Sequence, residues 1–105
     1  MYYYPVSAVL TECLILSVVE QQDSYGYEIS QTVKLVAAIK ESTLYPILKR
    51  LESTGAVTTQ SREYNGRLRK YYRITERGAE RIREFIEDVR EFERIYEFIC
   101  LGEKK

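Results

Sequence analysis

The chain has 105 residues, which fits one domain with one core, and its 45% hydrophobic and 30% charged residues are typical of a folded protein. It has no His and only two Cys, far apart in sequence, which argues against an enzyme and against a bound metal or other cofactor. Its net charge is zero, so overall composition indicates neither a basic nor an acidic partner.

The first predicted element is a helix from about Ser7 to Glu20, where apolar residues recur at helical spacing. Thr11, Glu12 and Ser17 interrupt its apolar stretch, which is therefore too short and too polar to span a bilayer. The first five residues lack the basic start of a secretory signal. We expect no membrane helix and a cytoplasmic location.

Two more helices are expected before the middle of the chain. The second runs from about Tyr25 to Leu35, and either Asp23 or Ser24 could be its N-cap. The third follows Ser42, its expected N-cap, and Pro46 fits this helix only near its first turn. It carries one apolar stripe, formed by Leu44, Ile47, Leu48 and Leu51.

The spacing of apolar residues then changes from that of helices to that of strands. Gly55 is placed to end the third helix in a left-handed conformation. Residues 57–62 and 69–74 are rich in β-branched and aromatic side chains and flank Asn65-Gly66, which predicts a β-hairpin. Thr75 then resembles the N-cap of a long last helix. Three helices, a hairpin and a long helix predict a mainly α (α+β) winged helix-turn-helix with a two-stranded β wing.

Charge is unevenly distributed along the chain. Residues 1–33 hold four acids and no Lys or Arg, residues 34–73 have a net charge of +6, and residues 74–105 have a net charge of −2. A basic centre between acidic flanks is the pattern expected if one face of the protein meets phosphate groups. Together with the predicted winged helix-turn-helix order of elements, this charge placement predicts binding to double-stranded DNA.

The third helix and the hairpin supply the expected DNA contacts. Hydroxyl and cationic side chains can bind phosphate oxygens, and Lys can also bond guanine. The alternatives are a solvated helix face for Lys49 and Arg50, packing at the edge of the core for Tyr45, and packing on the hairpin surface for Tyr71. The candidate DNA-binding residues are Ser42, Thr43, Tyr45, Pro46, Lys49, Arg50, Arg67, Arg69, Lys70 and Tyr71.

The last helix carries an apolar seam with coiled-coil-like spacing, which predicts a homodimer. The alternative is that this helix folds back on the first helix of its own chain. Phe92, Tyr96 and Tyr2 to Tyr4 could line a pocket for a small aromatic effector, or the two seam aromatics could be core residues. The seam consists of Ile82, Phe85, Val89, Phe92, Tyr96 and Ile99.

Three sequence blocks in this order resemble the PadR family of bacterial transcriptional regulators. They are Tyr25-Gly26-Tyr27-Glu28-Ile29, the segment 42–52 (STLYPILKRLE), and the segment 66–75 (GRLRKYYRIT) followed by Gly78. The resemblance covers most of residues 25–78. The short segment after residue 75 is similar to the branch of the family that has a single C-terminal helix.

The resemblance implies a dimeric winged-helix repressor whose third helix and wing bind a palindromic operator. It also implies that the last helix packs on the partner's first helix. Some members of this branch bind planar aromatic drugs between the dimer helices with the help of Trp, and this chain has no Trp.

We thus expect a sequence-specific transcriptional regulator, a repressor that binds an inverted-repeat operator as a homodimer. Residues 1–75 would form its DNA-binding domain and residues 76–105 its dimerisation helix, together one compact unit. The alternative function is a winged-helix module that binds another protein and does not bind DNA.

Overall fold

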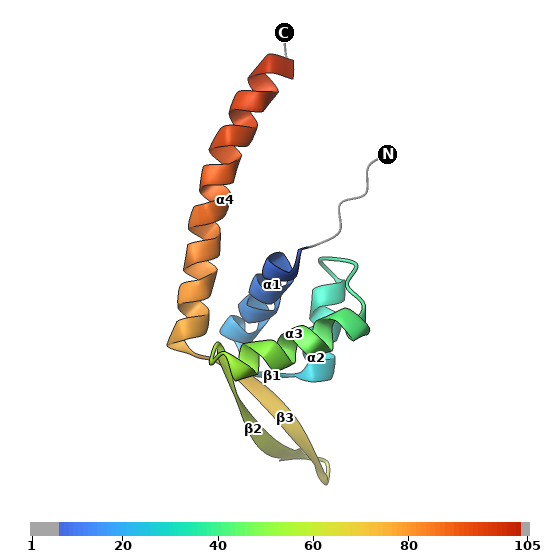
Figure 1. The fold of residues 1–105 in the computed structure, drawn as a ribbon. Coiled ribbons are helices and arrows are strands. Elements are labelled where there is room, and N and C mark those ends of the chain that lie inside the picture. The colour runs from blue at the N-terminus through green and yellow to red at the C-terminus, as the bar shows by residue number, and fades with distance from the viewer. Residues whose placement is uncertain (1–6, 104–105) are drawn as a thin grey trace.

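The structure, a computed structural model, describes residues 7–103 and contains a body of three short helices from which a hairpin and a long helix extend (Figure 1). The molecule is elongated, 63 × 31 × 20 Å, because the hairpin and the long helix point away from each other. The predicted order of three helices, hairpin and long helix is confirmed. The elements are α1 (Ala8–Gln21), β1 (Ser24–Tyr25), α2 (Gly26–Lys34), α3 (Glu41–Ser53), β2 (Val57–Tyr64), β3 (Arg67–Ile74) and α4 (Glu76–Glu103).

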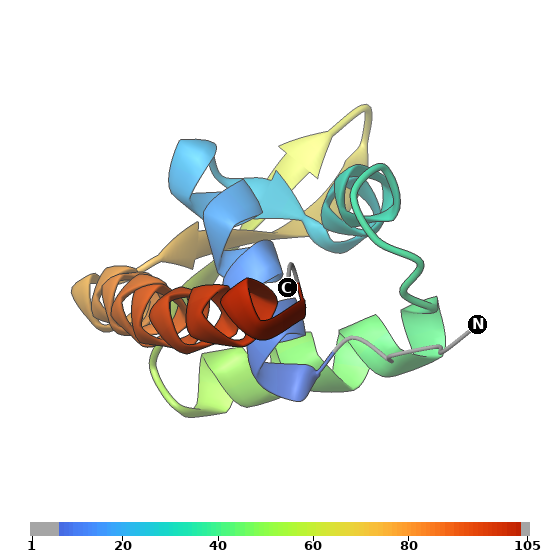
Figure 2. The same cartoon turned by 90° about the horizontal axis from the view of Figure 1, so that it is seen from above.

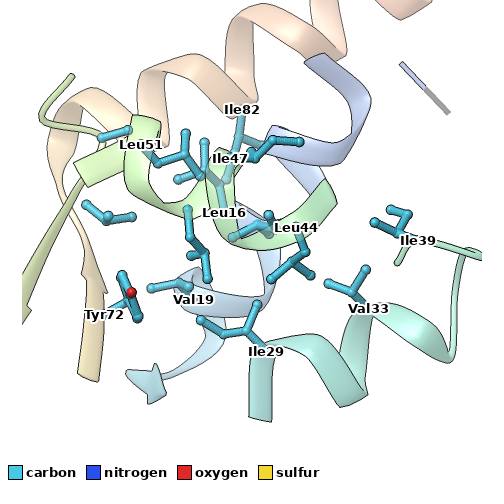
Figure 3. Packing of buried hydrophobic residues seen from close by; sticks show 14 residues of the cluster. Leu16, Val19, Ile29, Val33, Ile39, Leu44, Ile47, Leu51, Tyr72 and Ile82 are labelled. Atoms are coloured by element: carbon cyan, nitrogen blue, oxygen red, sulfur yellow. The ribbon is translucent and has the colours of Figure 1, made fainter. Parts of the chain in front are cut away.

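The core lies where α1, α2 and α3 meet the base of the hairpin (Figure 3). The predicted stripe of α3 faces inward, and all four of its residues are buried. Tyr72 of β3 and Ile82 of α4 complete the cluster. The first part of α4 packs on α1. The rest of α4 extends beyond the body (Figure 1), and from above the helix is seen to cross in front of α1 (Figure 2). None of the helices within residues 7–103 combines the length and hydropathy needed to cross a bilayer.

The hairpin belongs to a sheet of three strands in the order β1-β3-β2, whereas two strands were expected. The additional strand, β1, is two residues long and pairs Tyr25 with Tyr71. Asn65 and Gly66 alone connect β2 and β3, and their φ values of 50° and 78° are those of a type I′ turn. This turn lets the strands extend to Tyr64 and Arg67, further than the sequence indicated.

The predicted N-caps of α2 and α3 are wrong. α2 begins at Gly26, directly after β1, and no side chain caps it. The two expected caps are engaged elsewhere, since Asp23 binds arginines of the hairpin and the Ser24 hydroxyl donates to the Gln22 carbonyl at 3.2 Å. α3 begins before Ser42, with Lys40 at its cap position and no side-chain cap.

The other helix signals have mixed outcomes. Gly55 has φ 81° just after α3, as predicted, and the Thr75 hydroxyl accepts a hydrogen bond from the Gly78 amide at 3.2 Å, which confirms it as the cap of α4. Pro46, however, is the sixth residue of α3 and not near its first turn. It therefore leaves the Ser42 carbonyl without the amide donor that a helix normally supplies.

Candidate nucleic-acid interface

The outer face of α3 carries the first group of predicted DNA-binding side chains. Ser42, Thr43, Tyr45, Pro46 and Lys49 are all exposed, because the apolar stripe occupies the opposite face of the helix. The structure thus brings these five side chains together on the outward face of α3. They offer two hydroxyl groups, an aromatic ring and a cation to whatever binds this face.

The Tyr45 side chain is partly packed against the protein and partly exposed to solvent. Its side chain is 42% exposed, and a Cβ atom added to Gly26 at the start of α2 would lie 3.1 Å from Tyr45 Cε1. The ring therefore packs on α2 through a contact that requires a small residue at position 26. Packing at the edge of the core and an outward contact are both compatible with this position.

We call the hairpin formed by β2 and β3 the wing. Three side chains of α3 connect the outer face of this helix to the wing. Tyr45, Lys49 and Glu52 follow one another at intervals of four and three residues and so lie on one side of the helix. Glu52 accepts from Lys70 at 2.9 Å and from Thr59 at 3.1 Å. These two bonds, that with Lys70 foremost, hold the pKa of the Glu52 carboxyl below its usual value, and Glu52 raises the pKa of Lys70. The side of α3 that carries Lys49 therefore continues onto the wing.

Arg50 differs from its neighbours because its guanidinium is engaged within the protein. It donates to Glu12 of α1, with Nε 2.9 Å and Nη2 2.5 Å from Glu12 Oε1. The Glu12 side chain is only 5% exposed, and it also accepts from Arg81 of α4. The sequence placed Arg50 at the edge of the outer face and gave no sign of this partner.

The wing carries alternating tyrosine and arginine side chains on the face that also holds Tyr71. Arg69 lies 4.4 Å from the ring centre of Tyr25 and 4.2 Å from that of Tyr64, distances typical of cation–π contacts. Arg62 lies 4.6 Å from the ring centre of Tyr71, and the Tyr25 and Tyr71 rings meet edge to face at 5.5 Å. Tyr71 therefore packs on the wing surface, one of its two predicted positions.

Sequence reasoning missed several residues of this surface. Tyr25, Tyr64 and Arg62 belong to it but were not among the candidates. Strand alternation could have indicated the last two, because Arg62 faces Arg69 across the hairpin and Tyr64 faces Arg67. No comparable signal indicated Tyr25, since β1 is too short to recognise from its sequence.

Asp23 fixes the base of the wing to the loop before β1. Its carboxylate accepts from Arg73 at 2.9 Å and from Arg62 at 2.5 Å. These two bonds, with Arg73 the larger influence, lower the pKa of the Asp23 carboxyl. One acid thus neutralises much of the charge of two wing arginines and holds β2 and β3 to the helical body.

Lys49 and Arg67 are the candidate cations with the greatest freedom to bind an external anion. Both are exposed, and neither forms an ion pair with any other residue between positions 7 and 103. Lys49 lies on α3 and Arg67 beside the turn of the wing. Lys70, Arg69 and Arg50 already have partners and would bind phosphate only by sharing or exchanging them.

The predicted apolar seam divides into an inner and an outer part. Ile82 is buried, Phe85 and Val89 are half-buried, and Phe92, Tyr96 and Ile99 are exposed. A hollow of about 220 Å³ lies between α1 and the start of the seam, lined by apolar side chains that include Leu10, Cys13 and Ile86. The predicted seam did not include other exposed apolar residues of these two helices, namely Val9, Leu10, Ile86, Ile95, Phe98 and Leu101.

Comparison with known proteins identifies the family. The model of the transcriptional regulator PadR-like family matches residues 15–84, which include the core, α3 and the whole wing. The crystal structure of smu.1704 from Streptococcus mutans UA159 is 50% identical in sequence, with a TM-score of 0.83, over 96% of this chain and 95% of that one. A PadR family transcription regulator from Clostridium difficile R20291 is 30% identical, with a TM-score of 0.78, over 86% of this chain and 97% of that one.

The fold is shared with a more distant protein as well. The structure of Bacillus subtilis PadR in complex with operator DNA has a TM-score of 0.63 and 22% identity over 71% of this chain and 45% of that one. The winged-helix fold expected from the sequence is thereby confirmed, as is the family resemblance of the three sequence blocks. The chain belongs to the transcriptional regulator PadR-like family.

Proposed function

We propose that the protein is a homodimeric repressor that binds an inverted-repeat operator through α3 and the wing. The observation that carries the proposal is the pair of exposed cations, Lys49 and Arg67, that have no ion-pair partner among the described residues and lie on two connected elements. The operator complex of Bacillus subtilis PadR, which shares this fold, supports DNA as the ligand. Two recognition helices in a dimer would meet successive major grooves about 34 Å apart.

The proposed contacts differ between the two elements. α3 would enter the major groove with the side chains of Ser42, Thr43, Tyr45, Pro46 and Lys49. The wing would lie along the backbone with Arg67 at its end and with Arg69, Lys70 and Tyr71 closer to the body. For Arg50 we propose a supporting role, because Glu12 already binds its guanidinium.

The proposed dimer forms through α4, and residues 1–75 and 76–105 would act as its DNA-binding and dimerisation parts. Support comes from the large apolar side chains that the outer half of α4 exposes, including Phe92, Ile95 and Phe98 at 65%, 55% and 77%. Burying them against a second copy would stabilise the assembly in proportion to the apolar area removed from water. The operator would overlap a promoter in the cytoplasm, and occupancy would block transcription without catalysis.

An aromatic effector at the dimer interface remains a prediction. The Phe92 and Tyr96 rings are stacked, with centres 6.4 Å apart and planes 14° apart, and both are exposed. A flat molecule could extend this stack, although the same rings could serve only to pack the dimer. Tyr2 to Tyr4, the other candidates for such a pocket, lie outside the described residues.

The function is tested by selecting duplexes that the wild-type protein binds from sheared genomic DNA and measuring their affinity for variants. Lys49→Ala and Arg67→Ala should each weaken binding, by about tenfold if each side chain contributes about 1.4 kcal/mol. Arg90→Ala is the matched control, because Arg90 is an exposed base on α4 whose one ion-pair partner within residues 7–103 is Glu87. A protein that selects no duplex even at low salt would instead be a module for binding another protein.

A further inference from the structure

Glu12 is the one charged residue among the buried residues of α1, most of which are apolar. Ile15 and Leu16 follow Glu12 at intervals of three and four residues, so the three side chains lie on the same face of the helix. The side chains of Ile15 and Leu16 are fully buried. A carboxylate at such a site is stable only when other groups supply charge and hydrogen bonds. The partners of Glu12 therefore have to remain in place for α1 to keep this geometry.

The two partners of Glu12 come from the two helices that the proposed function treats separately. Arg50 belongs to α3, which would read the DNA, and Arg81 belongs to α4, which would form the dimer. Arg50 binds one carboxylate oxygen through two nitrogens, and Arg81 binds the other oxygen. One buried side chain thus joins both helices by charge-assisted hydrogen bonds, which are directional and stronger than neutral ones.

The bonds from Arg50 and Arg81 to Glu12 affect the relative orientation of α3 and α4, because of the way these helices pack. α3 and α4 each pack on α1 far more than on each other. In a dimer built on α4, the angle between α3 and α4 would determine where the two copies of α3 stand relative to each other. A rotation of one protomer's α3 by a few degrees would shift the site that it meets on DNA.

We propose that Glu12 is a positioning residue that fixes the angle between α3 and α4 and thereby the half-site spacing that the dimer accepts. The proposal rests on the proposed function, because spacing has a meaning only for a dimer on a two-part operator. Glu12 itself touches no DNA. Both arginines are about half exposed, at 50% and 45% of their side chains, so either one can be replaced without opening the core.

The test uses duplexes in which the distance between the two half-sites of the selected operator is changed by one or two base pairs. Affinity is measured by fluorescence anisotropy at concentrations where sedimentation shows each protein to be dimeric. The wild type should bind the original spacing about tenfold better than the altered ones, since each added base pair rotates one half-site about the helix axis. Glu12→Gln should reduce this preference to about threefold or less, since it removes the charge that holds both arginines.

Two further variants make the result decisive. Arg81→Gln cuts only the connection to α4 and should also reduce the preference, which keeps the test available if Glu12→Gln does not fold. Arg83→Gln is the control, because it breaks the exposed Arg83–Glu76 pair at the start of the same helix and should leave the preference unchanged.

The possible failures are distinguishable. If Glu12→Gln and Arg81→Gln keep the wild-type preference, or lose affinity equally at every spacing, Glu12 does not set the spacing and this inference is overturned while the function stands. If the wild type itself binds all spacings equally, the two-part operator is wrong and the role of Glu12 falls with it.

Discussion

Gly78 occupies the most crowded glycine position in the part of the chain that the structure describes. It lies in the first turn of α4, where Thr75 caps the helix and also bonds the Gly55-Ala56 segment that follows α3. A Cβ atom there would lie 2.3 Å from the Ala56 carbonyl oxygen and 2.8 Å from Ile74 Cγ1. Because one of these neighbours is backbone, it cannot move away as a flexible side chain could.

Gly78→Ala should therefore destabilise the protein although alanine favours helices. We expect a loss of about 2 kcal/mol in the free energy of unfolding, as for other substitutions that overfill a packed site. Gly102→Ala is the matched control, because nothing lies within 4 Å of its added Cβ atom and the helix propensity of alanine should raise stability slightly. Urea unfolding of the two variants measures the difference, and equal stabilities would contradict the packing argument.

At the scale of single residues, the sequence predicted which side chains are buried better than what the exposed ones bind. Helical spacing correctly placed the apolar stripe of α3 inside, because burial there depends only on local periodicity. It could not predict that Arg50 pairs with Glu12, 38 positions away, because this contact depends on how α1 and α3 are packed. The wrong cap at Asp23 has the same origin, since its arginine partners lie on distant strands.

The wing combines contacts within its hairpin and contacts with the segment before it. Arg62 and Arg69 face each other across the two strands, an arrangement that like charges disfavour. Arg69 stacks on two tyrosine rings, and Arg62 contacts both Tyr71 and Asp23. These contacts offset the repulsion between the two guanidinium groups.

Asp23→Asn should weaken the attachment of the wing and remove a pH dependence of stability. Because the folded pKa of Asp23 is lowered, its contribution is complete above the unfolded pKa, about 3.9, and is lost as the pH falls through the lower folded pKa. The wild type should thus be more stable than Asp23→Asn at pH 6, and the difference should shrink below about pH 4. Urea midpoints across this pH range measure the difference in stability between the two proteins. A difference that does not change with pH would exclude the Asp23 ion pairs as the cause of the lower stability.

In the sheet, the sequence predicted the turn of the hairpin but not the short strand β1. The Asn65-Gly66 turn was recognisable because the residue types that adopt positive φ are few. β1 was not, because two residues carry no detectable alternation and pair only after α1 has placed them beside β3. The sequence therefore predicted the hairpin but not the strand that joins it to the body.

For the molecule as a whole, the exposed part of α4 is the feature that a single protomer does not explain. The alternative, in which α4 folds back on α1, applies only to its first part, where Ile82 is buried beside the body. Beyond that part the seam residues and their neighbours are exposed. An apolar surface of this kind in a protein of this size is typical of an interface with another chain.

Phe92→Glu should convert the proposed dimer into a monomer. The Phe92 side chain is 65% exposed in the protomer, so the change should cost the protomer little stability, whereas a charge in an apolar interface is unfavourable. Arg90→Glu places the same side chain on an exposed polar position of α4 and should leave the dimer intact. Sedimentation at micromolar concentration distinguishes the two states, and a monomeric wild type would disprove dimerisation through α4.

The salt dependence of operator binding measures whether the cations of α3 and the wing meet phosphate groups of the DNA. If each protomer contacts about three phosphates, the logarithm of the association constant should fall with the logarithm of salt concentration with a slope of about −5. A slope near zero would show that these cations do not meet phosphate, and DNA binding through α3 and the wing would then be excluded.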